Sequence, residues 1–217
     1  MLELRNVDKQ YIKHGSRIRV LQDISLAVDK GEYVAVQGPS GCGKTTLLLI
    51  TGALLRPDRG RVLFNGIDLY NLGVKERGEF RASNVGFVFQ QYHLIPYLTV
   101  LENVMTPDLA RRRGDTLNRG LELLERLSLS HRRNHRPAEL SAGEKQRAAL
   151  ARALITGPEL LLADEITGNL DARNAGIVLD FVKNFVNGGG TVMMVTHDEK
   201  AAAVAHRTWS LAPVFSE

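Results

Sequence analysis

Residues 38–45 read Gly38-Pro39-Ser40-Gly41-Cys42-Gly43-Lys44-Thr45, and this stretch decides the fold. It matches the phosphate-loop pattern G-x-x-x-x-G-K-[ST] without a mismatch. The apolar run at 33–36 indicates a buried strand before it, and the apolar run at 46–50 predicts a helix after it. A plain glycine-rich turn is the alternative, and the full pattern between strand and helix speaks against it. We therefore predict a nucleoside triphosphate site.

The residue types of this phosphate loop suit an anion. Glycines let backbone N–H groups turn inward, and the helix start adds unpaired N–H groups and the positive end of a dipole. Lys44 is expected to reach the β- and γ-phosphates, and the Thr45 hydroxyl to bind Mg²⁺. The predicted nucleotide contacts are Gly38, Pro39, Ser40, Gly41, Cys42, Gly43, Lys44, Thr45 and Thr46.

The composition is that of a single globular domain spanning residues 1–217. A chain of 217 residues can bury one substantial core, and its 44% hydrophobic content is ordinary for such a protein. The net charge of +4 is mild. Two basic clusters, at 111–113 and 131–136, contain no interleaved aromatic residues. We predict a solvated or partner-facing surface there, and no nucleic-acid partner.

Cys42 is the single cysteine, so no internal disulfide can form and a reducing compartment is indicated. Cys42 lies near a helix start, where the pKa of a thiol tends to fall, and this would suit redox control. The favoured interpretation is that Cys42 is simply a small residue that fits the loop. No apolar run approaches the ~20 residues that span a bilayer, and the first residues have no signal-peptide pattern. Work at a membrane is therefore expected to go through a partner.

Apolar runs and turn residues outline the secondary structure. Alternation at 2–5 and the run at 20–28, after a turn at 14–16, predict a pair of N-terminal strands. Further strands are predicted at 33–36, 61–64, 85–89, 160–163 and 191–195. Helices are predicted from 46 to about 55, across about 92–153, where Leu117, Leu121, Leu124 and Leu127 recur at helical spacing, and at 171–186. This alternation favours an α/β fold with a mainly parallel sheet, in which residues 1–90 and 154–217 form the core and about 91–153 an inserted helical subdomain.

Two carboxylates end an apolar strand. Asp164 and Glu165 follow Leu160-Leu161-Leu162-Ala163. A buried strand needs no acids, so acids at its carboxyl end indicate a site there, although a strand running into a polar loop is the alternative. Beside a phosphate loop, Asp164 is predicted to hold Mg²⁺ and Glu165 to polarise an attacking water.

Ser141 and Glu144 have the spacing of a capping box at the start of a helix. An ordinary helix start explains this spacing. An N-cap serine beside a glycine, here Gly143, is also typical of a helix end that binds phosphate.

Taken in this order, the features resemble the ABC-type ATPases, the nucleotide-binding subunits of ABC transporters. Leu140-Ser141-Ala142-Gly143-Glu144 is similar to the family's signature motif LSGGQ; Ala142 and Glu144 depart from it. The resemblance covers essentially the whole chain. It implies a P-loop NTPase core of the RecA-like kind, an N-terminal antiparallel β subdomain, ATP and Mg²⁺ as ligands, and ATP hydrolysis.

The resemblance also implies roles for single residues. Gln90 matches a glutamine implied to contact Mg²⁺ and the water, and His197 a histidine implied to contact the γ-phosphate. Asp171 lies in a loop implied to cross a dimer interface. Tyr11 is similar to an aromatic that stacks on adenine, although it could equally be core packing. The expected catalytic residues are Lys44, Gln90, Glu165 and His197; the expected Mg²⁺ ligands are Thr45, Gln90 and Asp164; further nucleotide contacts are Tyr11, Ser141, Gly143 and Asp171.

Within the family, residues 90–96, 98–104 and 167–171 are most similar to the MacB and LolD group, the ATPases of macrolide export and lipoprotein release. Two departures stand out. Ile166 follows Glu165 where the group has proline, whose fixed φ would stiffen the turn. Residues 209–213 lack the family's usual closing strand and turn.

The resemblance implies two partners. A second copy, or a homologous ATPase, would complete each ATP site head to tail, and a membrane permease would receive the motion through residues 90–104. The expected location is the cytoplasm, at the inner face of the membrane. A regulatory ATPase of the cell-division type, which signals without transport, is the alternative. The DNA-repair relatives are disfavoured, because the chain has one cassette and no heptad run.

Overall fold

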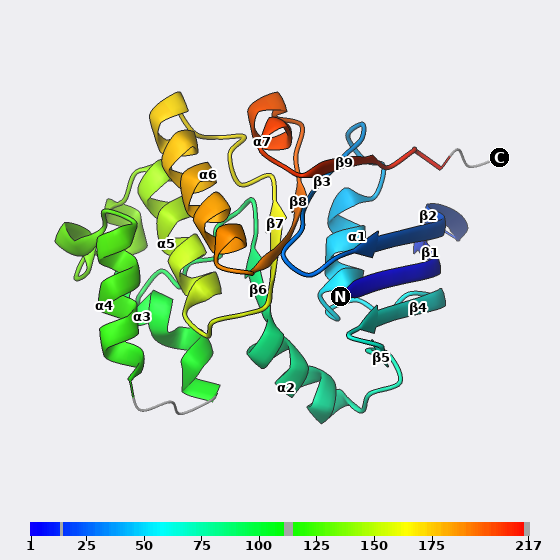
Figure 1. Cartoon of the computed structure of the whole chain (residues 1–217), viewed down its shortest axis with the longest axis horizontal. Helices are drawn as coiled ribbons and strands as arrows, with labels where there is room; N and C mark the ends of the chain where they lie inside the picture. The colour runs from blue at the N-terminus through cyan, green and yellow to red at the C-terminus, as the bar shows by residue number, and fades with distance from the viewer. Residues whose placement is uncertain (14, 111–114, 215–217) are drawn as a thin grey trace.

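A computed structural model describes residues 1–13, 15–110 and 115–214. The predicted basic cluster at 111–113 and His14 of the predicted turn lie outside these residues. Two sheets and a group of helices make up the molecule, and the helices α3, α4 and α5 lie on the side away from the antiparallel sheet (Figure 1).

The larger sheet is parallel and has the strand order β6-β7-β8-β3-β9. Its strands are β3 (Tyr33–Gln37), β6 (Val85–Val88), β7 (Leu160–Asp164), β8 (Thr191–Val195) and β9 (Arg207–Ser210). Every residue of β7 and β8 is buried. Leu160 and Leu162 belong to one hydrophobic cluster, and Leu161 and Ala163 to the other. The sheet is therefore covered on both faces, which explains why these strands are continuous apolar runs.

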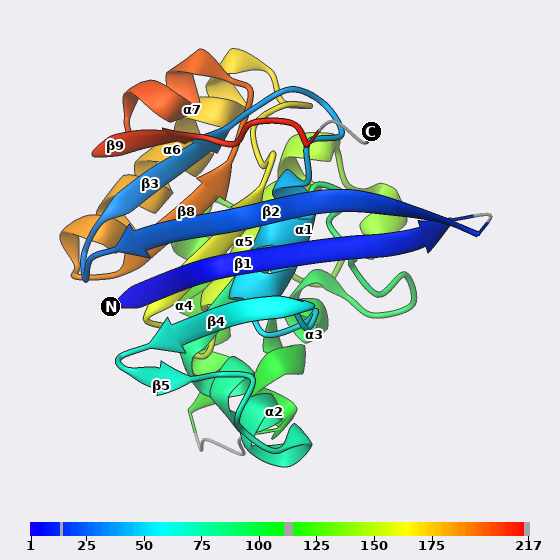
Figure 2. The ribbon, with the colours of Figure 1, turned by 90° about the vertical axis from the view of Figure 1, so that its right-hand side faces the viewer.

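The smaller sheet is antiparallel, in the order β2-β1-β4-β5, and Figure 2 shows it as a separate layer. Its strands are β1 (Leu2–Lys13), β2 (Ser16–Val28), β4 (Arg59–Phe64) and β5 (Ile67–Asp68). One hydrophobic cluster contains residues of β1, β2 and β4, of α1 (Lys44–Thr51) and of the parallel sheet. The helix α1, which follows the phosphate loop, is thus packed between the two sheets.

The remaining helices are α2 (Val74–Asn84), α3 (Val100–Met105), α4 (Thr116–Arg126), α5 (Ala142–Leu154), α6 (Ala172–Asn187) and α7 (Glu199–Ala203). Short 3-10 turns lie at Thr106–Ala110, Ser130–Arg132 and Pro137–Glu139. The stretch 92–153 is therefore mainly helical but interrupted, and α3 begins only at Val100. Thr99 caps α3 by accepting a hydrogen bond from the backbone N–H of Glu102.

The structure confirms the predicted α/β class with a parallel sheet, N-terminal antiparallel strands and inserted helices. The domain boundaries near residues 90 and 154 stay a prediction. The predicted end of α1 near residue 55 is wrong, because Gly52 caps the helix and Ala53 turns the chain with a φ of 57°. The expected lack of a closing strand is also wrong, since β9 pairs in parallel with β3 and places Trp209 opposite Val36.

Candidate functional site

Four loops meet at one edge of the parallel sheet. Because β3, β6, β7 and β8 are parallel, their carboxyl ends lie along the same edge. The phosphate loop follows β3, Gln90 follows β6, Asp164 and Glu165 end β7, and His197 follows β8. Residues separated by more than a hundred positions in the sequence are thus brought to one site.

Glycine is required at two positions of the phosphate loop, for two different reasons. Gly43 has a φ of 100°, and a Cβ there would lie 2.7 Å from the Val20 carbonyl oxygen of β2. At Gly38 a Cβ would lie 2.5 Å from the carbonyl oxygen of Leu211, just after β9. The loop is therefore enclosed between the antiparallel sheet and the end of the parallel one.

The start of α1 carries positive charge and no competing acid. Gly43 is its N-cap and has no side chain to bond the first N–H groups, and no acidic residue stands in the first turn. Lys44 is only 7% exposed, and its Nζ donates to the carbonyl oxygens of Gly38 and Pro39, each at 2.9 Å. A helix start of this kind attracts an anion such as phosphate.

Thr45 and Asp164 form a pair of oxygen donors at the same edge. The Thr45 hydroxyl donates to Asp164 Oδ2 at 2.8 Å. Burial raises the pKa of the Asp164 carboxyl, as does the nearby charge of Glu165, against the opposing effects of Thr45 and Lys44. Mg²⁺ prefers oxygen ligands and takes one or two from the protein beside substrate phosphates. A hydroxyl and a carboxylate in contact, next to a phosphate loop, fit that ion.

The Glu165 carboxylate lies between two polar side chains. Gln90 Nε2 donates to its Oε2 at 3.1 Å, and Nδ1 of His197 lies 3.2 Å from its Oε1. Glu165 also has a φ of 49°, a left-handed conformation that costs a residue with a Cβ about 1–3 kcal/mol and tends to occur at functional sites. With Ile166 buried in place of the expected proline, the carboxylate still has these two contacts.

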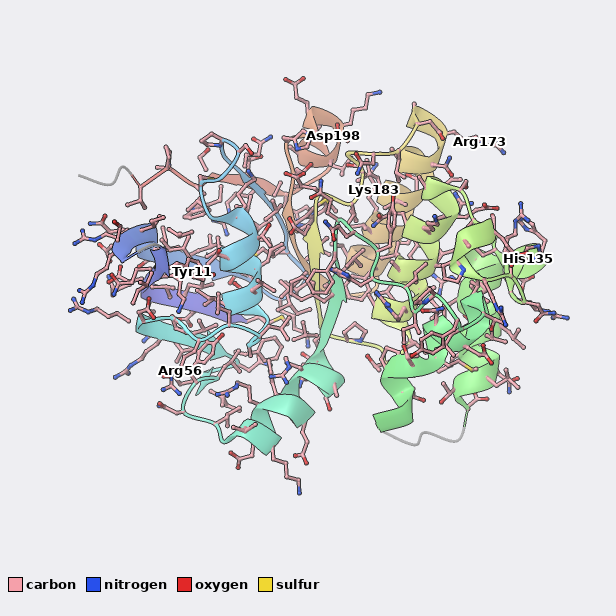
Figure 3. The ribbon with its side chains drawn as sticks, turned by 180° about the vertical axis from the view of Figure 1, so that it is seen from behind. Tyr11, Arg56, His135, Arg173, Lys183 and Asp198 are labelled. Carbon is pink, nitrogen blue, oxygen red and sulfur yellow. The ribbon has the colours of Figure 1, made fainter. Side chains whose placement is uncertain are left out.

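The loops after β7 and β8 are joined by a further contact. Thr167 Oγ1 donates to Asp198 Oδ2 at 2.9 Å, and a Cβ at Gly168 would lie 3.4 Å from the His197 ring. Asp198 also caps α7, and Figure 3 labels it at the top of the view. The contact thus joins the loop that carries Glu165 to the loop that carries His197, and the sequence analysis did not include it.

Ser141 has the capping-box geometry that its spacing predicted. Its hydroxyl accepts from the backbone N–H of Glu144 at 3.3 Å, and the Glu144 carboxylate accepts from the Ser141 N–H at 2.8 Å. Arg132 Nε donates to the same carboxylate at 2.7 Å. Burial alone would raise the pKa of Glu144, but the hydrogen bonds from Ser141 and Arg132 and the charge of Arg132 lower it to about 2.

We expect Glu144 to make folding stability depend on pH. Its pKa of about 2 in the folded chain lies below the ordinary 4.5, so its contribution is complete above about pH 4.5 and is lost as the pH falls toward 2. Glu144→Gln should therefore lower the free energy of unfolding at pH 7, and the gap to the wild type should narrow at pH 3. Urea denaturation at both pH values measures it. Glu125→Gln, at an exposed position of α4, is the control, and a Glu144→Gln gap unchanged between pH 7 and 3 would contradict the assignment.

The helix starts of α5 and α6 touch each other. Asp171 caps α6 by accepting from the Asn174 N–H at 2.9 Å. The Asn174 side chain also bonds Arg147 of α5, and a Cβ at Gly143 would lie 2.5 Å from it. Glycine at 143 is thus needed for this close approach. Asn174 and Arg147 were missed by the sequence analysis, and the only signal was their polarity beside two helix starts.

The structure brings together one part of the predicted site and leaves another part apart from it. Lys44, Thr45, Asp164, Glu165, Gln90 and His197 gather at the sheet edge. Ser141, Gly143 and Asp171 gather at the starts of α5 and α6. Tyr11 lies on β1, 40% exposed, with Lys9 Nζ 5.7 Å from its ring centre. Figure 3 shows Tyr11 and His135 at opposite ends of the molecule. All the predicted contacts with a nucleotide or Mg²⁺ stay predictions, including those of Tyr11, Ser40 and Thr46, of Gln90 with Mg²⁺ and of His197 with the γ-phosphate.

Helix lengths bear on the membrane question. In the part of the chain that the structure describes, no helix is both long enough and apolar enough to cross a bilayer.

Comparison with known proteins identifies similar sequences. The family model described as ABC transporter matches residues 21–168. The lipoprotein-releasing system ATP-binding protein LolD of Shewanella oneidensis is 46% identical over 206 residues, which cover 94% of this chain and 90% of that protein. LolD of Myxococcus xanthus is 44% identical over 215 residues, covering 98% and 96%.

Solved structures are similar as well. The dimeric structure of MJ0796, a bacterial ABC transporter cassette, has a TM-score of 0.93 and 39% identity, covering 98% of this chain and 94% of that one. A dimeric post-hydrolysis state of the same cassette, bound to ADP and Pi, has a TM-score of 0.93 at 37% identity, covering 100% and 98%.

Proposed function

The chain belongs to the ABC transporter family of ATPases, and from this we propose that it is the ATP-binding subunit of a lipoprotein-releasing transporter, driving a separate membrane subunit. One observation carries the catalytic part of the proposal. The Glu165 carboxylate lies between Gln90 and His197, next to the Thr45–Asp164 pair and the phosphate loop. The relatives named for lipoprotein release, at 44–46% identity over nearly the whole chain, support the transport part.

Each residue in this proposal has a distinct task. The phosphate loop and Lys44 bind the triphosphate. Thr45 and Asp164 would hold Mg²⁺, and that ion would supply positive charge to neutralise the phosphates. Glu165 orients the attacking water and accepts its proton, and Gln90 and His197 hold the Glu165 carboxylate in place. Catalysis is then positioning and charge stabilisation by groups arranged before ATP arrives.

We further propose that two copies close head to tail around two ATP molecules. Within one chain, Ser141 caps the start of α5 and contacts Glu144. The phosphate loop precedes a different helix, α1. The start of α5 would supply its N–H groups to the γ-phosphate held by the other subunit. The similar cassette of known structure is a dimer, which supports this arrangement.

Mixing two inactive variants tests the shared site. Lys44→Ala removes the loop lysine, and Ser141→Ala removes the cap. If each site uses the loop of one copy and Ser141 of the other, a mixed dimer has one intact site. An equimolar mixture should then recover roughly a quarter of the wild-type phosphate release, because half of the dimers are mixed and one of their two sites works. Each variant alone is the control. A mixture no more active than the mean of the two variants would contradict the shared site.

Reconstitution tests the transport class. The chain is purified in detergent with its membrane partner, placed in proteoliposomes that contain an acylated lipoprotein, and supplied with ATP and Mg²⁺. We expect the lipoprotein to be released, and Glu165→Gln to block the release. ATP hydrolysis by the complex without lipoprotein release would favour the regulatory alternative, which no relative reported above supports.

A further inference from the structure

One guanidinium of α5 holds the loop that follows β6. Arg152 lies in the last turn of α5. Its Nη2 donates to the Tyr92 carbonyl oxygen at 2.6 Å, and its Nη1 to that of His93 at 2.5 Å. The proposed mechanism above assigns no task to this residue.

The two residues that Arg152 holds have an unfavourable backbone. Tyr92 has a φ of 54° and His93 a φ of 47°, and left-handed conformations are disfavoured for side chains with a Cβ. Local bonds engage the N–H groups of the turn: the Tyr92 N–H donates to the Phe89 carbonyl oxygen at 3.2 Å, and the His93 N–H donates to the Gln91 carbonyl oxygen. An outside contact to both carbonyls therefore helps to keep these consecutive residues in place.

Arg152 has an unusual set of partners for a half-buried arginine. None of the ion pairs across residues 1–13, 15–110 and 115–214 includes it. Burial lowers the pKa of its guanidinium, which nevertheless stays charged because the pKa of arginine is so high. Desolvation of such a charge is unfavourable without hydrogen bonds. Two carbonyl oxygens aligned on the planar fork of the guanidinium supply these bonds.

The held turn leads directly to the site. Gln90, two residues before Tyr92, donates to Glu165 at 3.1 Å. Phe89 stacks on Phe87 of β6 at 4.2 Å and meets the His93 ring edge-on at 5.0 Å. Gln90 is therefore fixed on one side by aromatic packing on the strand and on the other by the turn that Arg152 holds.

The same helix begins at Ser141. The capping box lies at the first turn of α5, and Arg152 lies at the last. Near that last turn β6 packs directly on the helix, since a Cβ at Gly86 would lie 2.4 Å from the Ala153 carbonyl oxygen. A displacement of α5 would therefore also displace the loop that carries Gln90.

We propose that Arg152 is a positioning residue for ATP hydrolysis: it holds the Tyr92–His93 turn so that Gln90 reaches Glu165, and it links this contact to the helix that carries Ser141. The proposal rests on the proposed roles of Gln90 and Glu165.

Arg152→Met, with Arg126→Met as its matched control, tests this role. Arg126 also lies in the last turn of a helix, α4, where it contacts Glu122 and the Phe181 ring. Since small misplacements of catalytic groups cost up to about 100-fold in rate, we expect Arg152→Met to lower kcat about tenfold or more. KM for ATP should change less than about twofold, because the phosphate loop is untouched. Hydrogen–deuterium exchange of residues 89–95 should be faster. Arg126→Met should leave all three unchanged.

Combining Arg152→Met with Gln90→Ala separates a positioning role from a structural one. If Arg152 acts through Gln90, the double variant should have the kcat of Gln90→Ala alone. The proposal would be overturned if the two single-variant losses in kcat multiplied in the double variant. It would also be overturned if Arg152→Met lowered kcat while Gln90→Ala left kcat unchanged. A neutral Glu165→Gln would instead overturn the proposed catalytic site. If Arg152→Met does not fold, Arg152→Lys serves as the test. One ammonium group cannot donate to both carbonyl oxygens as the guanidinium does, so kcat should fall in part while KM stays constant. Full activity of Arg152→Lys would overturn the proposal.

Discussion

Glu165→Gln is expected to lower ATP hydrolysis about 100-fold or more while leaving ATP binding intact, since a general base typically contributes 10²–10⁴-fold. Glutamine keeps the shape of the side chain but cannot accept a proton from water. It can still form hydrogen bonds with Gln90 and His197, the two residues that contact the Glu165 carboxylate in the wild type. Phosphate release under saturating ATP and Mg²⁺ measures the loss.

The same variant should accumulate the ATP-bound dimer. Contacts to the γ-phosphate are lost on hydrolysis, so a subunit that binds but does not hydrolyse stays closed. Light scattering after size-exclusion chromatography should give twice the monomer mass with ATP and the monomer mass with ADP. Glu199→Gln, an exposed acid in the first turn of α7, should behave as wild type. A Glu165→Gln chain that stays monomeric with ATP would contradict the two-subunit site.

Lys44→Ala is expected to weaken ATP binding about 100-fold or more, because truncating one partner of a buried charge pair typically costs 2–5 kcal/mol. The lysine is buried against the loop carbonyls, so its ammonium group is already desolvated. It lies in the loop that is expected to bind the phosphates. Titration with a fluorescent ATP analogue measures the affinity.

Two controls accompany this variant. Lys183→Ala removes an exposed lysine of α6 and should bind ATP as wild type does. Because Lys44 also bonds Gly38 and Pro39, a thermal melt checks that Lys44→Ala folds. Tight ATP binding by a folded Lys44→Ala chain would refute the phosphate-loop assignment.

The sequence predicted the parts of the site whose chemistry is local. Glycines, lysine and threonine in one loop, and two acids at the end of a buried strand, indicate their tasks before any contact is known. Thr45 and Asp164 were each predicted as a Mg²⁺ ligand, and the structure adds that they are in contact, because parallel strands place their carboxyl ends together.

The parts that were missed depend on tertiary packing. No residue of α2 is buried, so it has no apolar periodicity for a sequence to reveal. The strand β9 is four residues long and mostly exposed, and only its pairing with β3 makes it a strand. Arg152 gave no signal, since its partners are backbone carbonyls 59 and 60 positions away, which every residue type possesses.

The contact between Gly38 and Leu211 has a practical consequence for experiments on this protein. The carbonyl oxygen that would meet a Cβ at residue 38 belongs to the segment just after β9, and the Leu211 N–H donates to Gln37 at 2.8 Å. An affinity tag or fluorophore attached directly after this segment would pull on the backbone that supports the phosphate loop. Labels intended for measuring nucleotide affinity are better placed at an exposed position of α2 such as Lys75. This helix lies on the opposite side of the molecule from the C-terminal segment (Figure 1).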